Sequence, residues 1–287
     1  MIIVLGVAAA VLLGLGFVLQ QRVASQAPPE DSLSLRLFAD LIGKPMWLAG
    51  IAAMISGQLL GAAALGRGSV SLVEPLLTTN LLFALALAWL LSDQRLGWRE
   101  WGGAVLLVAG VVAFVVAAQP GGGMQRTDEP RNWIFVGVLV TITAIIVSLA
   151  RRATGPARAG LLAAAAGLLF GLQDGFTRGA ILVLGGGVVR LLASWLPYAV
   201  VVVAVLGLLL AQSAFEAAPL RASLPAITAA EPLTGIAYGI SVFAERVRIA
   251  PVWLVLEATG LIAMITGVVL LARSPMLAPH PSVGVPR

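Results

Sequence analysis

The chain has 287 residues, of which 60% are hydrophobic and only 11% are charged, and its mean hydropathy is +1.01. Soluble domains are about 45–50% apolar and about 25% charged, so this composition excludes a water-soluble enzyme. The chain has no cysteine and one histidine, His280, so it lacks the usual ligands of zinc or copper, and we expect no metal site and no cofactor. The formal charge of +5 comes from arginines between apolar segments, which indicates membrane topology rather than nucleic-acid binding.

Long apolar runs recur along the chain, each long enough to cross roughly 30 Å of hydrocarbon as a helix. Backbone polar groups in lipid must be hydrogen-bonded internally, which favours helices for runs of this length. The sequence therefore predicts an all-α membrane protein with nine transmembrane helices. They are expected at about 1–21, 45–65, 70–91, 100–118, 132–150, 159–183, 195–215, 223–243 and 252–272.

The basic residues predict how these spans are oriented. Nine spans place the two ends of the chain on opposite sides, with 11 of the 18 Arg and Lys residues on the C-terminal side. Positive charge concentrates in cytoplasmic loops, so we expect the N-terminus outside and the C-terminus in the cytoplasm of a bacterium, with the protein in the inner membrane. All seven tryptophans fall near expected helix ends, as an interfacial aromatic belt requires.

Self-similarity between the two halves is the most informative feature of the sequence. Residues recur in order at spacings of 154 or 157: Gln58 with Gln212, Glu74-Pro75-Leu76 with Glu231-Pro232-Leu233, and Gly103 and Gly110 with Gly260 and Gly267. The pairing predicts a first four-helix repeat (1–118), loops and a connector helix (119–158), a second four-helix repeat (159–272) and a disordered tail (273–287). Five spans separate the starts of the two repeats, an odd number, so the second is inverted relative to the first. Inverted repeats with a midplane binding site are typical of secondary transporters.

Short motifs within these repeats resemble a known family. They are the helix end Gly14–Arg22, Ala64-Leu65 before Glu74-Pro75-Leu76, Ala244-Glu245-Arg246, and the helices with Gly103 to Gly110 and Gly260 to Gly267. Together they resemble the drug/metabolite transporter superfamily, in its EamA-like and NIPA-like bacterial branches. The resemblance implies a membrane transporter. The family usually has five plus five helices, and this chain lacks one near its N-terminus, which is also a feature of the NIPA-like magnesium transporter branch.

Two glutamates within the spans are the first candidates for function, because ionisable groups at membrane depth are costly. Glu74 and Glu231 each precede a proline, which removes one helical hydrogen bond. Removal from water favours the protonated form of a carboxyl group, so either glutamate could bind and release a proton during transport. Alternatively, the Glu-Pro pairs form kinks and Glu74 reaches the headgroups.

Further polar residues accompany these glutamates. Thr78, Thr79 and Asn80 continue the polar stripe beyond Glu74. Gln58 and Gln212 either lock helices together or line the cavity. Asp174 and Arg178, four residues apart on one helix face, are expected to form a structural ion pair or a gate.

The segment from Ser32 to Gly43 has apolar residues near helical spacing, which predicts a short helix lying on the membrane surface. Its counterpart in the second repeat is expected around Arg190.

These features favour a secondary transporter that moves a small organic solute or metabolite by alternating access, coupled to protons. Its expected partners are the small-molecule substrate, protons and the lipid bilayer, with no nucleic acid, and the sequence leaves the oligomeric state open. No GxSxG, HExxH or Walker A motif is present, so we expect no enzymatic activity. Two alternatives stay open: a divalent-cation (Mg²⁺) transporter of the NIPA-like type, and a non-transporting membrane scaffold.

Overall fold

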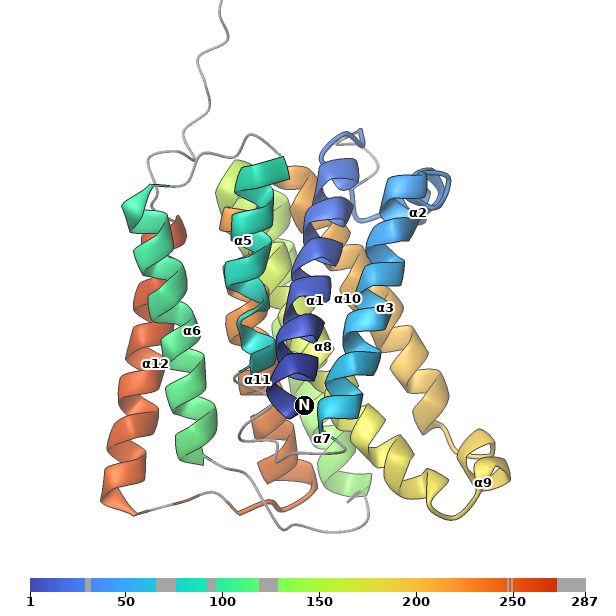
Figure 1. Ribbon diagram of the computed structural model, residues 1–287. Coiled ribbons are helices and arrows are strands. Elements are labelled where there is room, and N and C mark those ends of the chain that lie inside the picture. Colours follow the sequence, from blue (N-terminus) through green and yellow to red (C-terminus); the bar gives the residue numbers. More distant parts are fainter. Residues whose placement is uncertain are drawn as a thin grey trace, which may run out of the picture.

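The computed structural model describes residues 1–28, 32–65, 76–91, 97–118, 129–246, 248 and 250–272. In these residues the regular structure is helical, and the long helices form one bundle (Figure 1). The helices are α1 (Ile2–Ala24), α2 (Leu35–Ile42), α3 (Pro45–Leu65), α5 (Asn80–Leu91), α6 (Trp98–Ala118), α7 (Glu129–Arg152), α8 (Gly155–Leu184), α9 (Val188–Leu192), α10 (Leu196–Ala217), α11 (Leu220–Val242) and α12 (Pro251–Ala272). The tail 273–287 and Glu74 lie outside the described residues.

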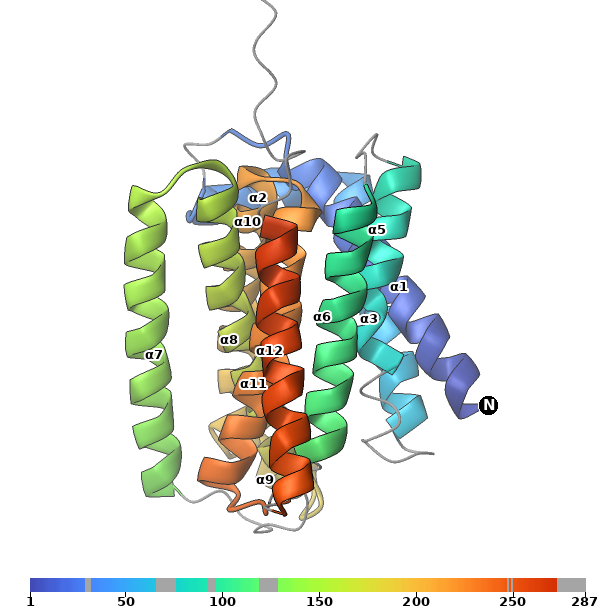
Figure 2. The same cartoon turned by 90° about the vertical axis from the view of Figure 1, so that its left-hand side faces the viewer.

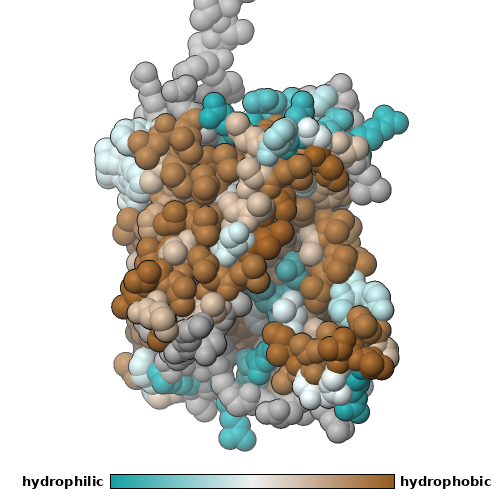
Figure 3. Space-filling model, turned by 45° about the vertical axis from the view of Figure 1, so that its right-hand side comes forward, coloured by the Kyte–Doolittle hydropathy of each residue, from teal (hydrophilic) through white to brown (hydrophobic). Residues whose placement is uncertain are grey.

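Several of these helices meet the requirements of a membrane span. Six described helices, α1, α6, α7, α8, α10 and α12, are long and apolar enough to cross a bilayer, and α2 and α3, bent by 92°, make a seventh if counted as one span. The apolar helix Leu76–Leu91 is shorter, and α11 contains Pro225 and Pro232. The face in Figure 3 is mostly hydrophobic between hydrophilic ends. An all-helical, multi-pass membrane protein is thus confirmed, whereas the number of nine spans stays a prediction.

The bundle is organised by a few extensive helix pairs. Helix α1 packs along α3, α8 packs along both α10 and α11, and α6 packs along α12. Helix α7 lies at the edge of the bundle, beside α8 (Figure 2). Many outward side chains of these helices are large and apolar, among them Ile134 and Val138 of α7, as expected where lipid replaces water.

The α6–α12 pair meets along a seam of glycines. A β-carbon on Gly110 would lie 2.7 Å from the backbone oxygen of Gly260, and one on Gly267 would lie 2.7 Å from the backbone oxygen of Gly103. Only glycine permits this approach, because any side chain would collide with the opposite backbone. Since Gly103 faces Gly267 and Gly110 faces Gly260, the two helices run antiparallel.

A polar and aromatic contact attaches α7 to the bundle. The Tyr238 hydroxyl of α11 donates a hydrogen bond of 2.7 Å to Asn132 Oδ1 of α7, and both side chains are fully buried. Phe135 and Phe176 pack edge-on against the same tyrosine ring, with centroids 5.3 and 5.9 Å away. Together with the packing of Trp195 on Trp133 of α7 and its hydrogen bond to Glu129, these contacts hold a helix that buries few of its own residues.

The predicted short helix in the segment 32–43 is confirmed as α2. Its Leu37 and Leu41 are buried, and α2 contacts α3 and α10, so it packs into the end of the bundle rather than only lying on a surface. The expected counterpart around Arg190 is the five-residue helix α9, which buries none of its side chains.

Candidate functional site

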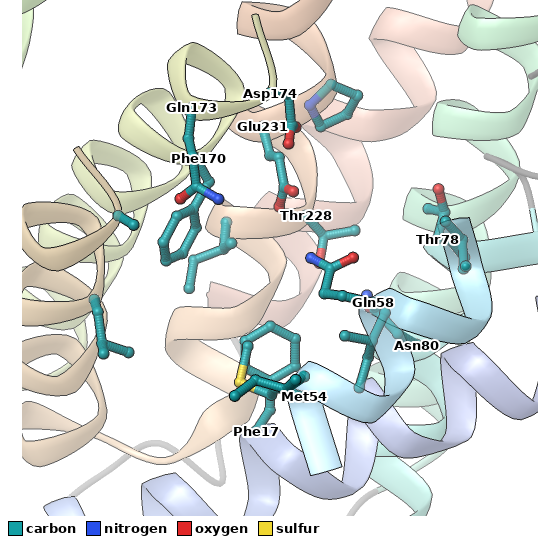
Figure 4. A pocket seen from close by; sticks show the side chains of 18 of the residues that line it. Phe17, Met54, Gln58, Thr78, Asn80, Phe170, Gln173, Asp174, Thr228 and Glu231 are labelled. Carbon is teal, nitrogen blue, oxygen red and sulfur yellow. The ribbon is translucent and has the colours of Figure 1, made fainter. Parts of the chain in front are cut away.

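A cavity of about 420 Å³ lies within the bundle (Figure 4). Its walls come from α1, α3, the segment at 77–80, α8, α10 and α11. The first three precede residue 119 and the last three follow residue 158, so both halves of the chain build it. None of its described lining residues belongs to α6, α7 or α12.

One wall carries the carboxylates. Helix α11 contributes Thr228 and Glu231, and α8 contributes Gln173 and Asp174. Pro232 follows Glu231 within α11 and cannot donate the helical hydrogen bond that the backbone oxygen of Thr228 would otherwise accept. Close packing of α8 on α11 at Gly171, where a β-carbon would meet the Glu231 backbone oxygen, fixes the two carboxylate-bearing helices against each other.

The opposite wall carries neutral polar groups. Gln58 of α3, Thr78 just before α5 and Asn80, the first residue of α5, line it, and in Figure 4 the Gln58 side chain points towards Thr228. The Oδ1 atom of Asn80 is buried without a hydrogen-bond partner. Thr79 does not line the cavity, and its hydroxyl donates to the backbone oxygen of Leu76 at 2.5 Å.

The remainder of the wall is apolar. Phe17 of α1, Met54 of α3 and Phe170 of α8 are its largest hydrophobic members (Figure 4). A concave site with mainly apolar walls and a few convergent polar groups is typical of small-molecule binding. The cavity can therefore accept a solute with an apolar body and a polar end.

Gln212 lies outside this wall, in a buried network between helices. Its Nε2 donates to Gln20 Oε1 of α1, and its Oε1 accepts a 3.1 Å hydrogen bond from Trp47 Nε1 of α3. Gln20 Nε2 in turn donates to the sulfur of Met54. Of the two roles considered for this glutamine, the structure supports the locking of helices.

Asp174 and Arg178 have different surroundings although they are one helical turn apart. Asp174 lines the cavity, whereas Arg178 forms an ion pair with Glu245 and lies 4.6 Å from the centre of the Phe243 ring. Glu245 is nearly buried, and Arg178 is 42% exposed. The ion-pair partner of Arg178 therefore lies in the segment after α11, and the residue spacing on α8 does not predict it.

Sequence reasoning missed several of these residues. Phe17, Met54, Phe170 and Thr228 line the cavity, but in so apolar a chain nothing distinguishes them from lipid-facing or packing residues. Glu245 was recognisable only as part of the Ala244-Glu245-Arg246 motif. Within the residues that the structure describes, no group of three or more His, Asp or Glu side chains could hold a metal ion.

The helices and the internal cavity define a multi-pass membrane protein with space for a small ligand. Residues 44–116, which span α3 to α6, match the EamA-like transporter family, and the expected resemblance to these transporters is confirmed. An uncharacterized protein of Corynebacterium glutamicum is 28% identical over 274 residues, which cover 95% of this chain and 94% of that protein. A probable magnesium transporter of Arabidopsis thaliana, NIPA2, is 24% identical over 127 residues, 44% of this chain and 38% of that protein. No solved structure matches with statistical significance.

Proposed function

We propose that the protein is a secondary active transporter that moves a small organic solute or metabolite by alternating access, coupled to protons. The observation that carries this proposal is the cavity itself, which is built by helices of both halves and contains Glu231 and Asp174. A binding site between two halves can be exposed to either side when the halves tilt against each other.

The architecture that we propose for this movement is a pair of inverted four-helix repeats, 1–118 and 159–272, with α7 as the connector between them and nine spans in all. The α6–α12 seam supports it, because Gly103 and Gly110 match Gly260 and Gly267 in the repeat. A two-fold axis relating the repeats turns the contact between Gly103 and Gly267 into one between Gly260 and Gly110, and both contacts occur. Such reciprocity is the mark of a two-fold interface.

We assign proton coupling to Glu231, with Glu74 as its repeat counterpart. Glu231 is a carboxyl group on the wall of a largely apolar cavity, next to a break in helical hydrogen bonding. Solute and proton can therefore compete for, or share, one small site. The protein is expected in a bacterial inner membrane with its N-terminus outside and its C-terminus in the cytoplasm.

A ligand screen followed by flux measurement tests this function. Purified protein is screened by thermal shift against small organic solutes and against MgCl₂, and solutes that stabilise it are tested for uptake into proteoliposomes with and without a pH gradient. We expect an organic solute to stabilise the protein and to accumulate only when a pH gradient is applied. Stabilisation without uptake of any ligand contradicts the proposal.

A Mg²⁺ transporter is the second candidate, and the similarity to the probable magnesium transporter favours it. Magnesium is usually held by one or two carboxylates together with retained waters, and Asp174 and Glu231 both line the cavity. Stabilisation by MgCl₂ alone, with Mg²⁺ entry reported by an indicator inside the vesicles, identifies this function instead.

A further inference from the structure

Three side chains form a layer immediately beyond one end of the cavity. On α1, Gln20 follows the cavity residue Phe17 by three positions. On α10, Gln212 follows Leu208 by four, and on α3, Trp47 precedes Ile51 by four. Each residue is thus about one helical turn beyond the wall, and all three lie beyond the same end of it.

This layer is closed and buried. Hydrogen bonds join Gln212 to Gln20 and Trp47 to Gln212, and the three side chains are no more than 5% exposed. They join α10, from the second half of the chain, to α1 and α3, from the first. Among the described residues of these three helices, none beyond the layer lines the cavity, so the hydrogen bonds close the cavity at this end.

Two further contacts lie outside this layer and cover it. The backbone N–H of Leu33, just before α2, donates to Ser213 Oγ of α10 at 3.0 Å, and Arg158 of α8 donates to Ser32 Oγ at 2.9 Å. Again each hydrogen bond joins the two halves of the chain. The closure at this end is therefore made of uncharged groups inside and, outside, of Arg158 together with Glu216, which both interact with Ser32.

A second pair of glutamines lies on the cavity wall itself. Gln58 of α3 and Gln173 of α8 both line the cavity (Figure 4), and no hydrogen bond joins them in the described part of the chain. Gln58 is the repeat counterpart of Gln212, at a spacing of 154. Gln173 is on α8, the first helix of the second repeat, as Gln20 is on α1. At the same spacing the counterpart of Gln20 is Asp174, next to Gln173, so the two-fold relation maps the pair on α1 and α10 onto Gln58 and a position adjacent to Gln173.

We propose that these two glutamine pairs are the two gates of the transport cycle. Gln20–Gln212, capped by Trp47, closes one end of the cavity in this structure, and Gln58–Gln173 closes the opposite end in the other conformation. The inference rests on the proposed transport function and goes beyond it, because it names the residues that close each end of the cavity in turn. Neutral amides suit a gate, because an opened amide exchanges its partner for water at little net cost, whereas a separated buried ion pair leaves uncompensated charge.

Because the chain has no cysteine, thiol chemistry can test the gates without background. Two double variants, Gln20→Cys/Gln212→Cys and Gln58→Cys/Gln173→Cys, are cross-linked in oriented proteoliposomes with one equivalent of a short bis-methanethiosulfonate, which joins the two thiols through reducible disulfides. Ala204→Cys, on the cavity wall, is added to each as a third thiol and is then labelled by a membrane-impermeant maleimide from either face. The reporter needs no substrate, so a failure of the gates is distinguished from a failure to find a transported solute.

We expect the first cross-link to abolish labelling of Ala204→Cys from one face and the second to abolish it from the other face. Reduction of either cross-link should restore it. If both cross-links block the same face, or neither blocks labelling, the assignment of the gates is wrong.

A variant without cross-links covers the case in which a cysteine pair fails to fold. Gln212→Leu keeps the side-chain volume but removes both hydrogen bonds of the closed gate, and we expect it to raise labelling of Ala204→Cys from the face that this gate seals. The matched control is Gln26→Leu, at an exposed position just after α1, which should leave the labelling unchanged. Unchanged labelling in Gln212→Leu, with a normal elution profile, contradicts the proposal.

Discussion

The cavity and the α6–α12 seam are built from opposite kinds of residue. The seam brings two backbones into contact at Gly103, Gly110, Gly260 and Gly267, and leaves no space for a ligand. The cavity is surrounded by long side chains from six segments, polar and apolar together. Membrane helices associate through close packing rather than a hydrophobic driving force, so the seam can act as the fixed joint. We propose that ligand binding and movement belong to the cavity side.

The largest effect in this comparison is expected at the cavity. Glu231→Gln keeps the shape of the side chain but cannot carry a proton. We expect uptake driven by a pH gradient to fall by about tenfold or more, equivalent to about 1.4 kcal/mol, while solute exchange without net proton movement continues. Both rates are measured in proteoliposomes.

Asp40→Asn, at an exposed position of α2, is the matched control and should leave uptake unchanged. Full pH-driven uptake in Glu231→Gln would remove this residue from the coupling mechanism.

The next effect is expected at the seam and concerns stability. A β-carbon on Gly110 would lie 2.6 Å from the backbone nitrogen of Met264, so Gly110→Ala must push α6 and α12 apart. Overpacking of this kind costs about 1–3 kcal/mol, which thermal unfolding in detergent can detect. A β-carbon on Gly102, which is also on α6, would meet nothing within 4 Å, so Gly102→Ala should leave the Tm unchanged or slightly higher. An equal change in Tm for Gly110→Ala and Gly102→Ala contradicts close backbone packing at the seam.

A smaller effect is expected where α7 joins the bundle. Tyr238→Phe leaves Asn132 Oδ1 without its donor, at a cost of about 0.6–1 kcal/mol for a hydrogen bond between membrane helices. The Tm should fall, and pH-driven uptake should not. Tyr198, the other tyrosine, is exposed and donates to the Leu192 backbone oxygen of the neighbouring turn, so Tyr198→Phe should change the Tm less. If Tyr198→Phe lowers the Tm more than Tyr238→Phe does, the buried Tyr238–Asn132 pair does not hold α7.

The smallest effect is expected at the Arg178–Glu245 ion pair. The double variant Arg178→Gln/Glu245→Gln removes both charges, so no isolated charge remains, and a half-exposed pair contributes at most about 1 kcal/mol. Arg178→Gln alone should lower the Tm more, because the nearly buried Glu245 then lacks its partner. Chemical unfolding of the two variants measures the difference. A double variant that is less stable than the single one would show that the pair itself is strongly stabilising.

The sequence supports the fold class well and the site partly. Glu231, Gln58, Thr78, Asn80 and Asp174 line the cavity, and each is recognisable because a polar residue inside an apolar run requires a reason. The sequence does not show which way other polar and aromatic side chains point. The Thr79 hydroxyl donates to the Leu76 backbone oxygen rather than facing the cavity, and Trp47, expected in an interfacial belt, is buried against Gln212.

The features that could not be predicted from the sequence are contacts between segments far apart in the chain. Trp47 and Gln212 are 165 positions apart and Gln20 and Gln212 are 192 apart. Helical periodicity describes one helix at a time and does not say which helices meet. The ion pair of Arg178 with Glu245 illustrates this, because Glu245 lies on a different segment that spacing along α8 cannot identify.

The most direct test of alternating access is to label Ala204→Cys, with no other substitution, from each face of sealed vesicles. The account predicts that impermeant maleimide reaches this thiol from either face, and that a transported solute slows both reactions. If labelling occurs from one face only, whatever the pH gradient and the solute, the cavity is a pocket and not a transport pathway.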